Sequence, residues 1–225
     1  MRARFTLAEV RAHAMEIVDR DGLNALNMRS LASALGTGPM TLYNYVRDRE
    51  ELEALVAEAV LADVKLPPTS EEWLADVKSI AIAVWESMRR HRNAVPLVLT
   101  RRTVSNEGFA PAEQLVAALV RGGLADQDLL AAFRGVLSLI MGAAQVELAG
   151  PVAGGAPEQD NIDAAGRIGR LAADRHPHLA ALASTSQRSS MSEDFDRALD
   201  MLLAGIQTRA DASRTERNSR RTSKR

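Results

Sequence analysis

The sequence predicts an all-α protein, with a small N-terminal helical domain followed by a larger helical domain. Its 225 residues suffice for one small and one medium-sized domain, and hydrophobic residues make up 46% of them. Apolar residues recur at three- and four-residue spacings along most of the chain. The alternation of Val, Ile and Thr that is typical of strands is missing. We therefore expect helices joined by short breaks.

The first helix is predicted to begin after Thr6. Thr6 and Glu9 have the spacing of a capping box, and Phe5 is placed to pack on Val10 as a hydrophobic staple. The apolar stripe of this helix ends near Gly22, a residue typical of helix ends.

Two short amphipathic helices joined by a tight turn are predicted over residues 27–46. Asn27 offers an acceptor side chain at the start of the first, and Gly36 supplies the left-handed backbone that ends it. Thr37 is expected to cap the second helix, and Pro39 suits its first turn because the missing N–H costs nothing there. This is the pattern of a helix-turn-helix, the third helix being the one that reads DNA.

The second of these short helices has an unusual outward face. Leu42 and Val46 point toward the core, which leaves six residues facing outward: Pro39, Met40, Thr41, Tyr43, Asn44 and Tyr45. Small polar and aromatic groups on a short exposed helix suit the major groove of DNA.

A fourth helix leads away from this unit. Asp48 and Glu51 form a further predicted capping box, and the helix is expected to run to about Val64 before Pro67 and Pro68 stop it.

Six later segments show helical periodicity and are expected to be helices: residues 70–90, 94–100, 111–122, 126–148, 162–173 and 192–209. Pro111 is taken as a first-turn residue. Gly150 to Gly155 is expected to be a loop, and residues 184–190 a Ser-rich break. From residue 210 onward the chain is rich in Ser, Thr and Arg, almost free of apolar residues, and expected to be disordered.

These elements predict the domain organisation. It comprises a helix-turn-helix domain (residues 1–47), a connecting helix (48–66), a ligand-binding and dimerisation domain (67–209) and a disordered basic tail (210–225).

Composition narrows the function. Cysteine is absent, which removes disulfides, thiolate catalysis and thiolate metal sites. We find no Ser/His/Asp set, paired acid or phosphate loop, so we expect neither an enzyme nor a cofactor. His176 and His178 offer a partial metal site, but two histidines are too few to hold a metal ion, so no metal site is expected. With no run of 18 apolar residues and no signal-peptide pattern, we expect a cytoplasmic protein without a membrane partner. The net charge of −1 does not argue against DNA binding, which uses a local basic surface.

The sequence resembles TetR-type repressors. The matching positions are Gly22, Leu26, Arg29, Leu31, Ala32, Leu35, Gly36, the run Thr41-Leu42-Tyr43, Val46 and Leu52. The resemblance is specific over residues 6–60 and looser over 70–150. There, Trp73 and the pair His91-Arg92 resemble the subgroup with a tetracycline-repressor-like C-terminal domain. A compact three-helix bundle without a nucleic-acid role is the alternative.

The resemblance implies DNA contacts by nine residues: Arg29, Thr37, Pro39, Met40, Thr41, Tyr43, Asn44, Tyr45 and Arg49. Asn44 suits adenine, to which it can make two hydrogen bonds, and a methyl group of Met40 or Thr41 suits thymine. Arg29 and Arg49 are spaced to grip phosphates. For Met40 and Tyr45, sideways packing is an equal alternative.

Two further roles are expected of the C-terminal helices. A two-fold operator needs a homodimer, for which we choose Val136, Ile140, Phe195, Leu199, Leu202, Leu203 and Ile206. An apolar ligand pocket is expected to be lined by Trp85, Met88, Val95, Leu99, Phe109, Leu119, Phe133, Leu137 and Met141. Packing within the monomer core is the alternative for both sets.

We therefore expect a ligand-responsive repressor that binds a palindromic double-stranded operator as a homodimer and is released by a small organic molecule. In the tetracycline repressor, two histidines help to hold drug and magnesium, and the matching positions here are Lys65 and Val98. This difference favours a metal-free ligand. The alternative function is a helical small-molecule-binding module or enzyme without DNA binding.

Overall fold

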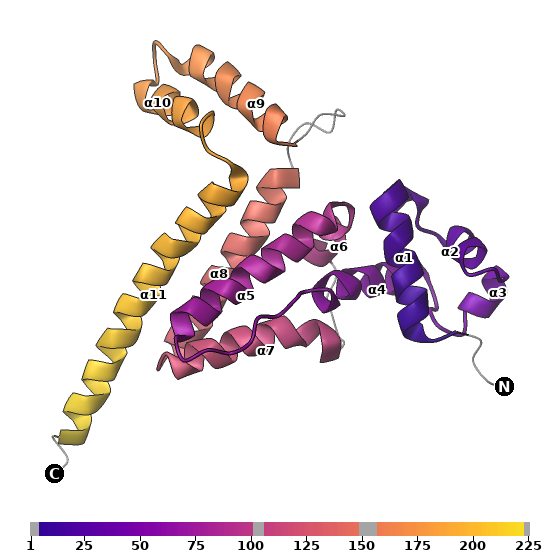
Figure 1. Cartoon of the computed structure of the whole chain (residues 1–225), viewed down its shortest axis with the longest axis horizontal. Helices are drawn as coiled ribbons and strands as arrows, with labels where there is room; N and C mark the ends of the chain where they lie inside the picture. The colour runs from indigo at the N-terminus through magenta and orange to yellow at the C-terminus, as the bar shows by residue number, and fades with distance from the viewer. Residues whose placement is uncertain (1–4, 101–105, 149–156, 223–225) are drawn as a thin grey trace. The chain divides into compact units, whose positions relative to one another are not determined.

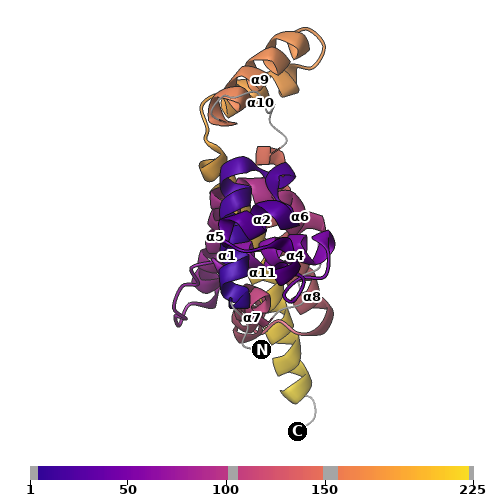
Figure 2. The same cartoon turned by 90° about the vertical axis from the view of Figure 1, so that its right-hand side faces the viewer.

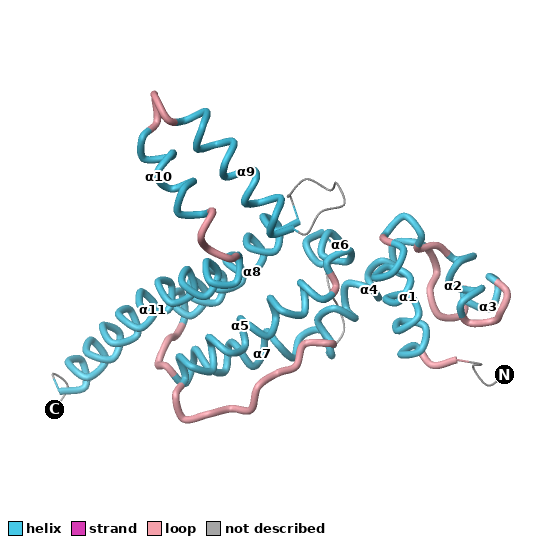
Figure 3. Tube along the Cα trace, turned by 45° about the horizontal axis from the view of Figure 1, so that its top comes forward, coloured by secondary structure: helices cyan, strands magenta, loops and turns pink. Residues whose placement is uncertain are grey.

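A computed structural model describes the backbone of residues 5–100, 106–148 and 157–222. Within these ranges the chain consists of helices and loops (Figure 3), so the all-α prediction is confirmed. The chain divides into two compact units, Met1–Ala125 (unit 1) and Asp126–Arg225 (unit 2). The four segments predicted from the sequence were defined by their expected roles in DNA binding, connection and dimerisation. Their assignment as domains stays a prediction.

Unit 1 begins with three short helices, which we call the reading head (residues 5–47). They are α1 (Leu7–Asp21), α2 (Met28–Ala34) and α3 (Pro39–Leu42), with a 3₁₀ turn at Leu23–Ala25 (Figures 1 and 2). Their shared core consists of fully buried apolar side chains, among them Val10, Val18, Leu31, Leu42 and Val46.

The capping box of α1 is confirmed. The Thr6 backbone N–H donates to Oε2 of Glu9 at 2.6 Å, and the Glu9 N–H donates to Oγ1 of Thr6 at 3.2 Å. At the other end Gly22, with φ of +81°, donates its N–H to the Val18 carbonyl oxygen. Local hydrogen bonds thus set both ends of the helix.

The connecting helix α4 (Arg49–Ala62) packs against α1 on one side and against α6 and α7 on others. The Oδ1 of Asp48 accepts the Glu51 N–H at 2.9 Å, as predicted, but the Glu51 carboxylate accepts from the Arg47 N–H instead of closing the box on Asp48. Leu52, Val56 and Val60 are fully buried along its length. One rigid element therefore joins the reading head to the rest of unit 1.

The rest of unit 1 consists of α5 (Trp73–Arg90), a 3₁₀ turn (Arg92–Ala94), α6 (Val95–Thr100) and α7 (Asn106–Arg121). α5 and α7 pack side by side. Asp76 of α5 is 5% exposed and accepts hydrogen bonds from Ser70 and from the Arg121 guanidinium. These hydrogen bonds hold the pKa of Asp76 below its usual value, the hydroxyl of Ser70 having the largest effect.

The predicted start of α7 at Pro111 is wrong. The helix already includes Asn106, and Pro111 lies inside it. Proline in a helix removes one hydrogen bond, that to the carbonyl four residues earlier. The buried face of α7 contains Leu115, Ala118 and Leu119, which are at most 4% exposed and hold the helix in place.

Unit 2 consists of two helix pairs. α8 (Asp126–Leu148) packs along α11 (Met191–Thr222), and α9 (Pro157–Ala172) forms a hairpin with α10 (Pro177–Ser186) (Figure 1). Where α8 and α11 meet, Gly135 lies against the side chain of Leu202.

Two features of unit 2 differ from the prediction. Residues 177–186 form α10, whereas no helix was predicted between residue 173 and the Ser-rich break at 184–190. α11 does not end near residue 209 but continues to Thr222, so residues 210–222 are helical rather than disordered. Arg209 pairs with Asp128 of α8 at 2.9 Å, Ala210 is fully buried, and Ser213 donates to Asp128 at 3.2 Å.

α8 is also the one described helix whose length and composition would allow it to cross a membrane, over Asp126–Glu147. Core helices of soluble proteins meet the same criterion. Little of this apolar segment is buried in the single chain, which leaves apolar surface for a partner to cover.

Candidate nucleic-acid interface

The turn between α2 and α3 is closed by its own backbone. Asn27 caps α2, since its Oδ1 accepts the N–H groups of Arg29 and Ser30, both at 3.0 Å. At the end of α2, the Gly36 N–H donates to the Ser33 carbonyl at 3.1 Å and the Thr37 N–H to the Ala32 carbonyl at 2.9 Å. These two bonds form a Schellman motif, which requires the left-handed backbone that Gly36 adopts at φ of +62°.

The start of α3 differs from the prediction. Gly38, not Thr37, is the N-cap residue, and no side chain caps the helix. Pro39 occupies the first turn as predicted. The regular helix ends at Leu42, after which the N–H groups of Tyr45 and Val46 still donate to the Leu42 carbonyl at 2.8 and 3.0 Å. Leu42 and Val46 anchor this short segment in the core.

The outward surface of α3 presents the predicted side chains together. Met40 is 78% exposed and Tyr43 is 49% exposed, while Pro39 and Asn44 are also exposed and Thr41 is half-buried. Nδ2 of Asn44 donates to the Thr41 carbonyl at 3.2 Å, which holds the amide beside the helix end. An exposed apolar side chain flanked by hydrogen-bonding groups suits a base edge with a thymine methyl group nearby.

Tyr45 packs sideways, which was one of its two predicted alternatives. Its hydroxyl accepts the Phe5 N–H at 2.8 Å, and the rings of Tyr45 and Phe5 lie 6.4 Å apart at 59°. Tyr45 is half-buried and fixes the start of α1 against the end of α3. This contact gives Tyr45 a positioning role, and its predicted contact with DNA stays a prediction.

Three arginines flank the outward surface of α3 in the chain. Arg29 is exposed on α2 and forms no ion pair with any residue that the structure describes. Arg49 pairs with Glu53 at 2.8 Å, and Arg47, which the sequence analysis missed, pairs with Glu51 at 3.2 Å. Hydrogen bonds from Arg47, first from its backbone N–H, lower the pKa of Glu51. The Arg47–Glu51 pair is exposed and therefore weak, so a phosphate group can compete for Arg47, whereas the Glu53 partner of Arg49 is only 12% exposed.

The predicted ligand-binding residues are distributed over both units. In unit 1, Trp85, Met88, Val95 and Leu119 are buried, Leu99 is half-buried, and Phe109 is exposed. In unit 2, Phe133, Leu137 and Met141 are half-buried along α8. These positions fit a role in packing or in ligand binding, and the ligand-binding assignment stays a prediction.

The predicted dimer-interface residues lie mostly inside the single chain. Val136, Ile140, Phe195, Leu199, Leu203 and Ile206 are 0–7% exposed, and Leu202 lies against Gly135. This burial fits packing within the single chain, which was the predicted alternative, and the dimer-interface assignment stays a prediction. The apolar side chains that face outward on these two helices are Leu130, Val146 and Met201, at 40%, 59% and 70% exposure.

A groove between α8 and α11 was not predicted. It has a volume of about 250 Å³ and is lined by Ser138, Leu139, Gly142, Ala143, Val146, Met191, Asp194, Phe195 and Ala198. Its lining is largely apolar. The small residues on α8 are the sequence signal that could have indicated a close approach or a groove.

No group of three or more histidine and carboxylate side chains in the described part of the chain is arranged to hold a metal ion. Of the two residues that led us to expect a metal-free ligand, Lys65 pairs with Asp63 at 3.1 Å and Val98 is half-buried on α6.

Residues 66–210, more than half of the chain, match the family model of the tetracyclin repressor-like C-terminal domain. An HTH-type transcriptional regulator of Saccharopolyspora erythraea is 31% identical over 135 residues, which are 60% of this chain and 57% of that protein. The HTH-type transcriptional repressor DrrR1 of Streptomyces coeruleorubidus is 30% identical over 145 residues, 64% of this chain and 54% of that protein. The chain thus spans little more than half the length of these relatives.

A solved structure covers nearly the whole chain. The TetR family protein ActR of Streptomyces coelicolor, in complex with actinorhodin, superposes with a TM-score of 0.77 and 27% sequence identity, over 91% of this chain and 96% of that one.

Proposed function

We propose, from the premise that this chain belongs to the TetR family of transcriptional regulators, that it is a cytoplasmic repressor that binds a palindromic operator and is released by a small organic molecule. The observation that carries the proposal is the outward surface of α3, where exposed Met40, Tyr43 and Asn44 stand on a turn closed by a Schellman motif. The family is one of regulators rather than enzymes.

Base reading is assigned to Asn44 and Met40, and phosphate contact to Tyr43, Arg29 and Arg49. An asparagine amide matches the N6 and N7 groups of adenine. To do so, Asn44 exchanges its 3.2 Å hydrogen bond to the Thr41 carbonyl for a bond to the base. Arg29 has no ionic partner among the described residues to give up, so we expect it to contribute more than Arg49.

A homodimer is proposed because α8 leaves much apolar surface uncovered in the single chain. Leu130 and Val146 of α8 and Met201 of α11 face outward. A second copy that covers this surface would also place two reading heads on one operator, with half-site centres about one or more helical turns of DNA apart.

The inducer is proposed to be an organic molecule that binds without a metal. One similar protein of known structure, ActR, was solved in complex with actinorhodin. In this chain Lys65 and Val98 stand where metal-dependent drug binding would need histidines, and Lys65 is engaged by Asp63. To release DNA, the ligand must bind more tightly to the conformation in which the two reading heads are spaced wrongly for the operator. A difference of about 1.4 kcal/mol in binding free energy shifts the equilibrium between the two conformations tenfold. We propose that α4, which joins the reading head to the rest of unit 1, transmits the change of conformation to the reading head.

The test is a fluorescence anisotropy titration of the protein with duplex DNA from upstream of its own gene and with a scrambled duplex. Asn44→Ala is expected to lose about 1–3 kcal/mol on the specific duplex only. Arg29→Ala is expected to weaken both duplexes alike and to reduce the salt dependence. Arg188→Ala, an exposed arginine of unit 2, is the matched control and should change neither. Equal losses for Asn44→Ala on both duplexes would contradict its base-reading role.

A further inference from the structure

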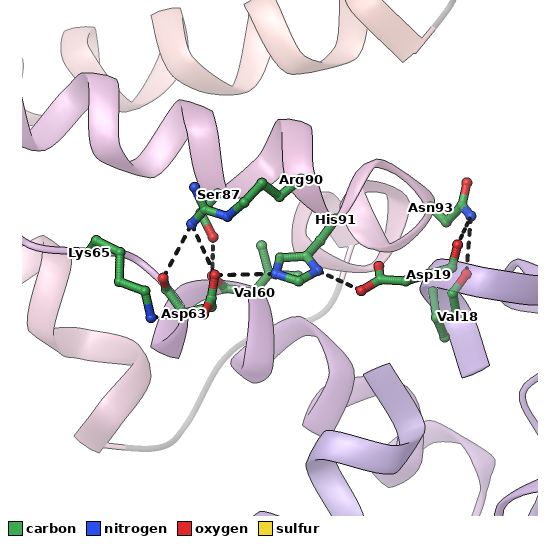
Figure 4. A network of polar contacts seen from close by, with 9 residues as sticks. All are labelled: Val18, Asp19, Val60, Asp63, Lys65, Ser87, Arg90, His91 and Asn93. Atoms are coloured by element: carbon green, nitrogen blue, oxygen red, sulfur yellow. Dashed lines mark hydrogen bonds and ion pairs between the residues drawn. The ribbon is translucent and has the colours of Figure 1, made fainter. Parts of the chain in front are cut away.

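A polar cluster lies where the C-terminal ends of α1, α4 and α5 meet within unit 1 (Figure 4). His91 ends α5, Asp19 lies in the last turn of α1, and Asp63 ends α4. We call these three residues, with Arg90 and Lys65, the joint. It connects the reading head, through α1, to the helix that leads away from it.

Both ring nitrogens of His91 face a carboxylate. Nδ1 lies 2.8 Å from Oδ2 of Asp19, and Nε2 lies 3.4 Å from Oδ2 of Asp63. A neutral imidazole has a single N–H, so it can donate to one of these oxygens and must turn a lone pair toward the other. Only the imidazolium form donates to both. The His91 side chain is 15% exposed, while its partners Asp19 and Asp63 are 34% and 36% exposed.

Three basic residues lie near His91, in space or in the chain. Arg90 of α5 donates to Asp63 at 2.9 Å, and Lys65, in the segment after α4, pairs with Asp63 at 3.1 Å. Arg92 follows His91 in the chain and is exposed. These cations oppose a further positive charge, but they act mainly on Asp63, whereas Asp19 has His91 as its one described ionic partner.

The backbone near His91 also favours a positive charge at this point. Three helix C-termini converge on the joint, and each presents carbonyl groups with partial negative charge. Nδ2 of Asn93 satisfies two of them, the carbonyl oxygens of Val18 and Asp19, each at 3.1 Å. A cation at this point therefore interacts favourably with the helix ends as well as with the two carboxylates.

We propose that His91 is a positioning residue whose imidazolium form fastens the reading head to α4, so that operator affinity is higher when the ring is protonated. A fastened head presents α3 at a fixed orientation. When the ring loses its proton, one of its two contacts becomes repulsive and the head gains orientational freedom, which must be lost again on binding DNA. The inference rests on the proposed function for its DNA readout.

The experiment measures affinity for the upstream duplex at constant salt, at about pH 6 and about pH 8, on either side of the range in which histidine ordinarily titrates. Wild-type protein is expected to bind at least about fivefold more weakly at the higher pH. His91→Gln, which keeps a neutral donor, should bind with similar affinity at both. His13→Gln is the matched control, since His13 is on α1 and its hydrogen bond within the described part of the chain is to the Glu9 carbonyl; it should retain the wild-type pH dependence.

A second variant tests the joint independently of any change at His91 itself. Asp19→Asn removes the negative charge that faces Nδ1 of His91 and is expected to reduce the pH dependence of operator binding. Full pH dependence in His91→Gln, or tighter binding at higher pH in the wild type, would overturn the inference. If the wild type binds no DNA at either pH, the proposed function fails, whereas wild-type binding that is equally tight at both pH values would show that the joint alone is wrong.

Discussion

The helix ends of the reading head and the C-terminal end of α11 in unit 2 are set by different kinds of contact. In the reading head, Thr6, Asn27 and Gly36 form hydrogen bonds with groups within five residues along the chain. In unit 2, α11 is held past residue 209 by Asp128 of α8, which is 81 residues from Arg209. Local partners can be identified in a sequence, whereas distant ones appear only when the helices have packed.

The largest expected effect comes from the core of the reading head. Leu42 is fully buried and anchors α3, so Leu42→Ala is expected to cost about 2–5 kcal/mol of the free energy of unfolding and to abolish operator binding. Thermal denaturation and anisotropy check the two effects. Leu42→Met keeps the volume and should cost under about 1.5 kcal/mol. If Leu42→Ala bound DNA normally, α3 would not depend on its anchor.

A second prediction concerns a long-range contact in unit 1. Arg121→Ala leaves the buried Asp76 carboxylate without its cation, and we expect a loss of about 1–3 kcal/mol at neutral pH, measured by urea denaturation. Since Arg121 is itself partly exposed, the lower part of this range is expected. Arg121→Lys keeps the charge and should lose less.

The difference in stability between the wild type and Arg121→Ala is expected to change with pH in a definite direction. The pKa of Asp76 is lower in the folded than in the unfolded protein, because Ser70 and Arg121 donate to its carboxylate. Its contribution to stability is therefore complete above the unfolded pKa of about 3.9 and is lost as pH falls through the folded pKa. The gap between wild type and Arg121→Ala should narrow below about pH 4. A constant gap would contradict an ionic role for the pair.

A local cap should have a smaller effect. Asn27→Ala removes the acceptor for the N–H groups of Arg29 and Ser30 and should cost about 1 kcal/mol. Asn24→Ala, the same change at an exposed position in the neighbouring 3₁₀ turn, is the control and should be neutral. Equal effects of the two changes would mean that capping does not set the start of α2.

The smallest effect is expected at the exposed contact between α8 and α11. Asp128→Asn removes the partner of Arg209, and because the pair is exposed the melting temperature should barely change. Hydrogen exchange should nevertheless quicken in the last described turns of α11. Unaltered exchange there would show that local helix propensity, not Asp128, extends the helix.

The sequence predicted the reading head well because its caps, turn and core positions act over short distances. The capping box at Thr6, the cap at Asn27 and the turn at Gly36 are all present. The range predicted for α8 is also observed, since its apolar stripe is continuous. Pro111 and the end of α11 were misjudged because packing against other helices outweighs local preference there.

The candidate site was predicted in part for the same reason. Exposure of Met40, Tyr43 and Asn44 follows from the inward position of Leu42 on a short helix. The contact of Tyr45 with Phe5, the joint at His91 and the burial of Phe195 and Leu199 depend on segments far apart in the sequence. No periodicity within one segment encodes such contacts, so sequence alone could not distinguish a packing role from a surface role.

The most direct measurement is a gel shift of the wild-type protein with duplex DNA from upstream of its own gene, at low salt and with scrambled competitor. The account predicts a discrete complex that resists the competitor and weakens steeply as salt is raised. Absence of any complex at low salt would contradict the assignment of α3 as a DNA-reading element.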